Sequence, residues 1–113
     1  MMIIKSKEWL FQGVFKIRSI EVFESLIHYY ILKSGFKIKD KLLTKFDFGG
    51  RTFYWCLSES HCVVSYYHEN KEAILYLASC NIEKYDKFLL LIKKIKSFSI
   101  DNGINFKQGA NDD

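Results

Sequence analysis

The first regular pattern along the chain is an alternation of apolar side chains with side chains of other types. Between residues 8 and 17 this alternation has the period of a β-strand, and Gly13 within it is a candidate for a bulge. The next stretch changes to helical spacing, which predicts a helix over 20–33 that covers a sheet. Ser19 is placed to cap this helix and Gly35 to end it. The apolar face of the predicted helix consists of Ile20, Phe23, Ile27, Tyr30 and Ile31.

The middle of the chain consists of β-prone segments separated by turn residues. These segments of bulky and branched apolar side chains span residues 36–48, 52–57, 62–67 and 73–79. The turn signals between them are Gly49-Gly50 and Asn70-Lys71. Consecutive antiparallel strands are therefore expected.

A second stretch of helical periodicity follows Asn81, which is placed to cap it. Apolar residues recur on one face while lysines lie on the other, which predicts an amphipathic helix over 82–98. Residues 101–113 are polar and are expected to form a frayed tail. Because no linker or repeat separates the elements, residues 1–100 are expected to form one α+β domain. Its predicted architecture is a two-layer sandwich, with both helices on one face of an antiparallel sheet.

The composition supports a folded domain. The 113 residues are 49% hydrophobic and 17% aromatic and include no proline, well outside the range of disordered chains. No apolar run approaches the ~20 residues of a membrane-spanning helix, and the first residues lack the features of a signal peptide. A cytoplasmic protein is therefore expected. The three cysteines fit no paired zinc spacing, which argues against a metal site or a disulfide scaffold.

The formal charge of +4 comes from lysines spread along the chain, with the densest group near the end of the second predicted helix. Lys93, Lys94 and Lys96 are interpreted as a solvated helix face, where their positive charges interact favourably with the dipole at the C-terminal end of the helix. Contact with an acidic partner is the alternative. Neither nucleic acid nor a membrane is an expected partner. His28 is interpreted as a surface residue of the first predicted helix.

A polar tripeptide interrupts the two central strands. Glu59-Ser60-His61 lies between segments that otherwise consist of bulky apolar residues. A solvent-facing loop is the structural explanation for this tripeptide. A functional explanation requires further residues around it that fit the same chemistry. The chain contains neither a glycine-rich phosphate loop nor a His-Glu-x-x-His motif, and Gly49-Gly50 alone is more typical of a turn than of a phosphate site.

Glu59-Ser60-His61, with the residues in register on both sides, resembles the corresponding segment of the prokaryotic S-adenosylmethionine decarboxylases. In that family the bond before the serine breaks autocatalytically, and the serine becomes a pyruvoyl group that withdraws electrons as carbon dioxide leaves. The resemblance makes Ser60 the precursor of this cofactor and Glu59 the new C-terminus. It also makes Cys80 the proton donor after decarboxylation, while Thr52 stands at the family's processing serine and keeps the hydroxyl.

The resemblance also implies an adenosine pocket, with His61 beside it. Phe46 and Tyr67 take the positions of the two aromatic residues that sandwich the adenine, and Glu69 that of the carboxylate that holds the ribose hydroxyls. Rings supply apolar contact, a carboxylate accepts two hydrogen bonds, and aromatic faces favour a positive sulfonium. The residues expected to converge on one pocket are Phe46, Ser60, Tyr67, Glu69 and Cys80.

The chain departs from the family at one residue of the processing machinery. The family's histidine five residues after the serine, which takes a proton in the elimination that completes cleavage, is Ser65 here. His68 is a doubtful substitute, since residues an odd number apart on a strand point to opposite faces. The proline of the family's Phe-x-Pro-x-Gly turn is Phe48 here.

Three functions remain open. The first is pyruvoyl-dependent decarboxylation of S-adenosylmethionine, which supplies aminopropyl groups for the synthesis of polyamines such as spermidine. The second is an uncleaved regulatory paralogue that binds S-adenosylmethionine, and the third is an enzyme of another reaction type on this substrate, such as a lyase. Residue 65 discriminates among them. Because the family forms dimers with active sites at the subunit interface, a homodimer or a heterodimer with a paralogue is expected.

Overall fold

The computed structural model describes residues 8–98 and 107–110. Its elements in chain order are β1 (Trp9–Lys16), α1 (Ile20–Lys33), β2 (Ile38–Lys45), a 3-10 turn η1 (Asp47–Gly49), β3 (Arg51–Leu57), β4 (Ser60–Tyr67), β5 (Glu72–Ser79), α2 (Ile82–Phe98) and β6 (Lys107–Ala110). Both helices have the predicted bounds, and each strand expected up to residue 79 is present.

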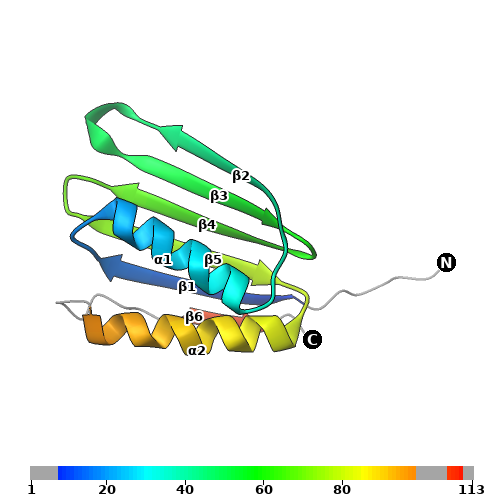
Figure 1. Cartoon of the computed structure of the whole chain (residues 1–113). Coiled ribbons are helices and arrows are strands. Elements are labelled where there is room, and N and C mark those ends of the chain that lie inside the picture. The colour runs from blue at the N-terminus through cyan, green and yellow to red at the C-terminus, as the bar shows by residue number, and fades with distance from the viewer. Residues whose placement is uncertain (1–7, 99–106, 111–113) are drawn as a thin grey trace.

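The strands of the described residues form one sheet in the order β2-β3-β4-β5-β1-β6, and every neighbouring pair is antiparallel. The strands β2 to β5 follow one another as a meander, and β1 joins the sheet beside β5. In Figure 1, α1 crosses in front of the sheet and α2 runs along β1 and β6. The two helices contact each other and share one core cluster, so the predicted two-layer sandwich is confirmed.

The core lies between the helices and one face of the sheet. In β3, β4 and β5 every second side chain is buried, as the two-residue period of a strand requires, and at the end of β5 Ala78 is buried as well. These side chains pack with Phe11 and Phe15 of β1 and with the apolar stripes of both helices. The opposite face, here called the open face, is covered by neither helix, and most of its side chains are partly buried or exposed. Its central residues are Tyr54, His61, Val63, Ser65, Ile74 and Tyr76.

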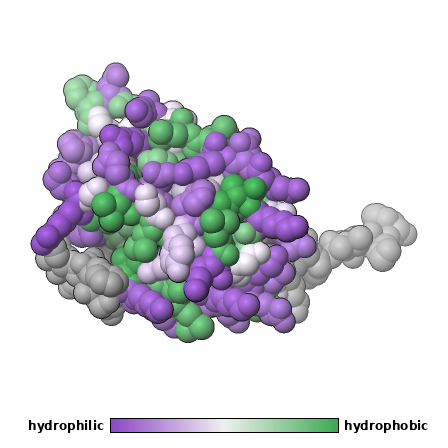
Figure 2. All heavy atoms as spheres, in the orientation of Figure 1, coloured by the Kyte–Doolittle hydropathy of each residue, from purple (hydrophilic) through white to green (hydrophobic). Residues whose placement is uncertain are grey.

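The helix ends follow the sequence signals. The Val22 amide donates to Ser19 Oγ at 3.2 Å, and Gly35 has a φ of 98° beyond the end of α1. The Lys84 amide donates to Asn81 Oδ1 at 3.1 Å at the start of α2. The surface on the helix side is mostly hydrophilic, with separate hydrophobic residues between the polar ones (Figure 2). None of the described helices is both long and apolar enough to span a membrane.

Gly13 does not mark a bulge. The pairing of β1 with β5 runs through it without a register shift. A Cβ atom at this position would lie 2.9 Å from a ring atom of Phe11 and 3.0 Å from one of Phe15. The glycine therefore leaves room for two core phenylalanines on the same face of the strand.

The expectation of a frayed tail is wrong for residues 107–110. They form β6, which pairs with residues 9–12 of β1. An edge strand such as β1 offers unpaired backbone groups, so a short segment can add to it without the side-chain alternation that marks a strand in the sequence. The rest of the expected tail lies outside the described residues.

Candidate functional site

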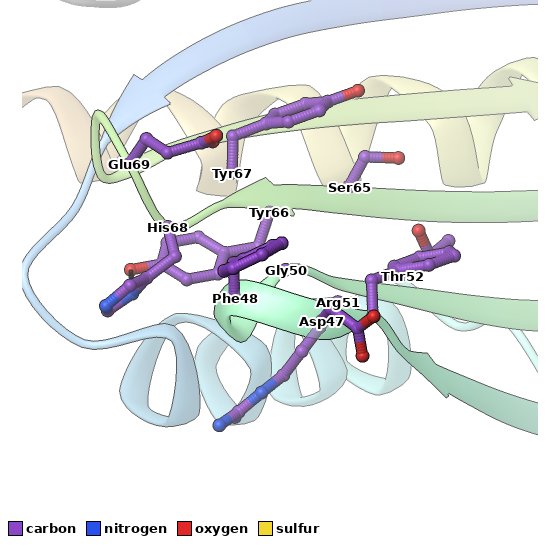
Figure 3. Close-up of a pocket in the computed structure, with 11 residues that line it drawn as sticks. Asp47, Phe48, Gly50, Arg51, Thr52, Ser65, Tyr66, Tyr67, His68 and Glu69 are labelled. Carbon is purple, nitrogen blue, oxygen red and sulfur yellow. Dashed lines mark hydrogen bonds between the residues drawn. The ribbon is translucent and has the colours of Figure 1, made fainter.

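A pocket with a volume of about 370 Å³ lies where the loop between β2 and β3 meets the turn after β4 (Figure 3). Four predicted site residues line it: Phe46, Thr52, Tyr67 and Glu69. Ser65, which stands at the family's histidine position, lines it as well. The structure therefore places the proposed adenosine contacts beside Thr52 and Ser65, two of the positions that the resemblance links to self-cleavage.

Strand register explains this convergence. Thr52 of β3 pairs directly with Ser65 of β4, and Tyr67 lies two residues further on the same face. Phe46 follows β2, and its amide donates to the Gly50 carbonyl oxygen at 2.8 Å, which closes the loop. Local hydrogen bonding thus places the first aromatic residue beside the end of β4.

His68 also belongs to the pocket lining, and it contacts the core beneath the loop between β2 and β3. Its Nδ1 lies 3.1 Å from the hydroxyl of Tyr66, a core residue, and the two rings meet edge to face. A Cβ atom at Gly49 would lie 3.0 Å from His68 Cγ, and Gly49 has a φ of 88°. In Figure 3, His68 lies beside Tyr66, whereas Ser65 projects from the other side of β4. His68 and Ser65 therefore do not occupy equivalent positions.

The aromatic wall of the pocket is accessible to a ligand. Phe46 is 56% exposed and Tyr67 47%, whereas most aromatic residues of the sheet's other face are buried. Phe48, at the position of the family's proline, is 89% exposed and has a φ of 65°. Aromatic side chains exposed in this way lose water from their rings when a flat ligand stacks on them, which favours binding.

The charges around the pocket favour a cation. Asp47 and Glu69 are exposed carboxylates of its lining. The only arginine of the lining, Arg51, turns to α1 and donates to Glu21 Oε2 at 2.7 Å, and this hydrogen bond lowers the pKa of Glu21. Since Arg51 is paired outside the pocket, the two carboxylates give the lining a negative charge.

A second group of predicted residues lies at the other end of the same hairpin. Ser58 and Glu59 form the turn between β3 and β4, and Glu59 has a φ of 68°. Ser60 Oγ donates to Ser79 Oγ at 2.7 Å, and the Cys80 amide donates to the Glu59 carbonyl oxygen at 3.3 Å. These two hydrogen bonds therefore join Glu59 and Ser60 to the end of β5, where Cys80 follows.

The cysteines differ in accessibility. Cys80 is exposed at this turn, whereas Cys62 is fully buried in the core and burial raises the pKa of its thiol. Cys80 is consequently the better placed of the two for proton transfer or chemical modification.

The predicted convergence of all these residues on one pocket does not occur within a single chain. Ser60 and Ser65 are five residues apart on β4, which corresponds to about 16 Å along a strand. Ser60 and Cys80 therefore lie far from Phe46, Tyr67 and Glu69. His61 is not beside the pocket either, because it stacks between Tyr54 and Tyr76 on the open face, with ring centroids 6.2 and 5.8 Å away.

Two contact residues have no clear signal in the sequence. Ser79 receives the Ser60 hydrogen bond because β4 and β5 pair these two residues directly, a register that the sequence does not reveal. Asp47 adds a carboxylate to the pocket lining through the 3-10 turn after β2. In the sequence, Ser79 is marked only by its neighbour Cys80, and Asp47 only by its neighbour Phe46.

An antiparallel meander joined by the first strand, with two helices on one face, defines the class of the fold as adenosylmethionine decarboxylase-like. The particular similarity is to the crystal structure of the adenosylmethionine decarboxylase from Aquifex aeolicus VF5. The TM-score is 0.71 at 12% sequence identity, over 92% of this chain and 88% of that chain. No family model matches the sequence, and no curated protein matches it. The similarity establishes the fold of the chain.

Proposed function

We propose that this chain binds S-adenosylmethionine, or a closely related adenosine-containing sulfonium compound, in the pocket described above. The observation that carries the proposal is the convergence of Phe46, Tyr67 and Glu69 on one cavity of suitable size. The rings offer stacking faces for adenine, and the Glu69 carboxylate is an acceptor for ribose hydroxyls. The excess of carboxylates favours the positive sulfur.

Pyruvoyl-dependent decarboxylation for polyamine synthesis is the reaction that the fold suggests. A pyruvoyl group made from Ser60 supplies an electron sink for the loss of carbon dioxide. Ser60 and Cys80 fit the precursor and the proton donor of that chemistry, since Ser60 follows the turn between β3 and β4 and the Cys80 amide bonds the turn residue Glu59. The hydroxyl of Ser65 does not fit the elimination that completes cleavage, because it is a poor base compared with an imidazole.

An uncleaved regulatory protein that binds S-adenosylmethionine is the second candidate. Ser65 favours it, since the pocket end of β4 lacks the base while Phe46, Tyr67 and Glu69 are all retained. Such a protein would keep the ligand pocket without forming the cofactor. Intact mass separates the two functions, because only the decarboxylase is cut between Glu59 and Ser60.

The separation of the two residue groups supports a dimer. The proposal includes a homodimer in which the open faces of two sheets pack, so that the pocket of one copy meets the turn between β3 and β4 of the other, next to Ser60 and Cys80. Half-buried rings at the centre of the open face suit such a contact. A paralogue with the same open face is the alternative occupant.

Calorimetric titration tests the binding proposal. S-adenosylmethionine is expected to give saturable heat, and Glu69→Gln is expected to weaken binding by about 1–3 kcal/mol because hydroxyl contacts to a charged acceptor are lost. Glu83→Gln is the matched control, since Glu83 is exposed on α2 and outside the pocket lining. Methylthioadenosine, which lacks the positive charge, is expected to bind more weakly than S-adenosylmethionine. No measurable heat from either compound at millimolar concentration would contradict the proposal.

A further inference from the structure

Ser79 is a buried hydroxyl that contacts the side chain of Ser60. The register of β4 and β5 sets the two residues directly opposite each other, and Ser60 Oγ donates to Ser79 Oγ at 2.7 Å. Ser79 has no exposed surface. Its hydroxyl accepts from the Asn81 amide at 2.9 Å and donates to the Asn81 carbonyl oxygen at 3.3 Å. Because Asn81 holds Ser79 Oγ through two hydrogen bonds, the Ser60 hydroxyl donates to an acceptor whose position is fixed.

The carbonyl group next to Ser60 is also held from β5. The Cys80 amide donates to the Glu59 carbonyl oxygen at 3.3 Å. A backbone N–H in this position stabilises the negative charge that develops on the oxygen when a nucleophile attacks the carbon. Glu59 has a φ of 68°, a left-handed conformation that residues other than glycine rarely adopt, so the turn holds the residue before the bond in an unfavourable backbone conformation.

We infer that Ser79 is a positioning residue for an acyl shift at the Glu59–Ser60 bond, and that a single chain carries the contacts for this step. In the shift, Ser60 Oγ bonds to the Glu59 carbonyl carbon and the bond from that carbon to the Ser60 nitrogen breaks. The hydroxyl proton passes to the departing nitrogen, which becomes a free amine, so no co-reactant is needed. The inference rests on the proposed function, which makes Glu59–Ser60 the processing bond.

The residues for the two steps of self-cleavage, ester formation and the elimination that follows, lie at opposite ends of the hairpin. Ser79, Cys80 and Asn81 serve the ester-forming half from within the same chain, at the turn end of the hairpin. Thr52 and Ser65 lie about 16 Å away along the strands, at the pocket end. The substitution of the family histidine by Ser65 therefore leaves the ester-forming contacts intact.

Hydroxylamine provides the test, because it attacks an ester at its carbonyl carbon and needs no elimination. The expected products are a fragment that ends in the hydroxamate of Glu59 and a fragment that begins with the free amine of Ser60. The Asn102–Gly103 bond, a sequence that alkaline hydroxylamine cuts in other proteins, checks the reagent within the same sample. The fragments are measured by mass spectrometry over time at several protein concentrations.

Wild type is expected to be cut between Glu59 and Ser60 at a rate that does not depend on protein concentration. Ser79→Ala is expected to slow this cut about tenfold, because the reacting Ser60 hydroxyl loses the acceptor of its hydrogen bond. Ser79→Thr, which keeps the hydroxyl, is expected to restore it. Ser58→Ala is the matched control, since Ser58 lies in the same turn and its backbone amide, not its side chain, bonds Lys37.

Ser79→Cys is a second variant in case the alanine variant does not fold, because it keeps the shape of the buried side chain but bonds weakly. Equal rates for wild type, Ser79→Ala and Ser79→Cys would overturn the inference, as would the absence of any cut in wild type. A cut in Ser60→Ala would also overturn it, because no ester can form there. Titration with S-adenosylmethionine tests the proposed pocket separately. A protein that hydroxylamine cuts between Glu59 and Ser60 but that does not bind S-adenosylmethionine would contradict the proposed ligand and leave the inference about Ser79 standing.

Discussion

His28 has a structural role that its position on a predicted helix surface does not indicate. Its Nδ1 accepts a hydrogen bond of 3.0 Å from the indole Nε1 of Trp55, a fully buried core residue. Lys41 lies 5.0 Å above the same indole ring and pairs with Glu24 of α1. His28 and Lys41 therefore join α1 to the outer strands of the sheet, and the interpretation of His28 as a plain surface residue is incomplete.

Replacement of His28 by alanine is expected to lower the free energy of unfolding by about 1–2 kcal/mol, because the Trp55 N–H loses its acceptor inside the protein. Urea unfolding followed by tryptophan fluorescence measures the change. Ser25→Ala is the control, since Ser25 is exposed on the same helix. Equal midpoints for the two variants would show that the hydrogen bond contributes nothing to stability.

At the level of secondary structure, the sequence predicts most of the fold because local signals agree. The bounds of α1 and α2 follow from apolar stripes with a capping residue before each. The segment expected to be a strand as far as residue 48 ends at Lys45, because the chain then turns through Asp47–Gly49, where Phe48 adopts a left-handed conformation that nothing in its side chain indicates. The pairing that makes β6 is likewise not a local property.

The resemblance points to Phe46, Tyr67 and Glu69 as ligand contacts. The structure places them in one pocket lining, and their role in binding stays a prediction. The resemblance does not reveal that Ser60 lies opposite Ser79, because strand register depends on the turns and on packing across the whole sheet. It also gives no information on which chain of an assembly supplies each residue.

The register of β3 and β4 makes residue 65 the natural point for restoring a base. Ser65 pairs with Thr52 and lines the pocket. Wild type is expected to stay wholly or mostly uncleaved, because a positioned base contributes ~10²–10⁴-fold to proton removal. Ser65→His is expected to raise the cleaved fraction, and intact mass of freshly purified protein measures it. Ser65→Asn is the control, since an amide does not accept the proton.

Two fragments in the wild-type spectrum would contradict this expectation. A fragment ending at Glu59, together with one that begins with a pyruvoyl mass, would mean that Ser65 does not prevent elimination. The decarboxylase would then be preferred over the uncleaved regulatory protein. An unchanged spectrum for Ser65→His would instead show that residue 65 does not reach the processing bond of either copy.

On the scale of the whole molecule, the two faces of the sheet differ in what covers them. The core face carries both helices, whereas on the open face the stacked rings of Tyr54, His61 and Tyr76 keep partial contact with solvent. An antiparallel sheet can leave one face in water, but that face is then usually polar. The partly exposed aromatic and branched residues at its centre are typical of a surface that another protein covers.

A homodimer through the open face is therefore expected in solution, and sedimentation of wild type measures it. Tyr76→Lys is expected to yield monomers, because two copies of the new charge would be buried against apolar rings. Leu32→Lys is the matched control, since Leu32 is 52% exposed on α1 at the other side of the molecule. Tyr76→Lys is also expected to weaken the binding of S-adenosylmethionine although Tyr76 lies outside the pocket lining, because the second copy completes the site. A monomeric wild type, or a Tyr76→Lys variant that remains dimeric with full affinity, would show that the pocket works within a single chain.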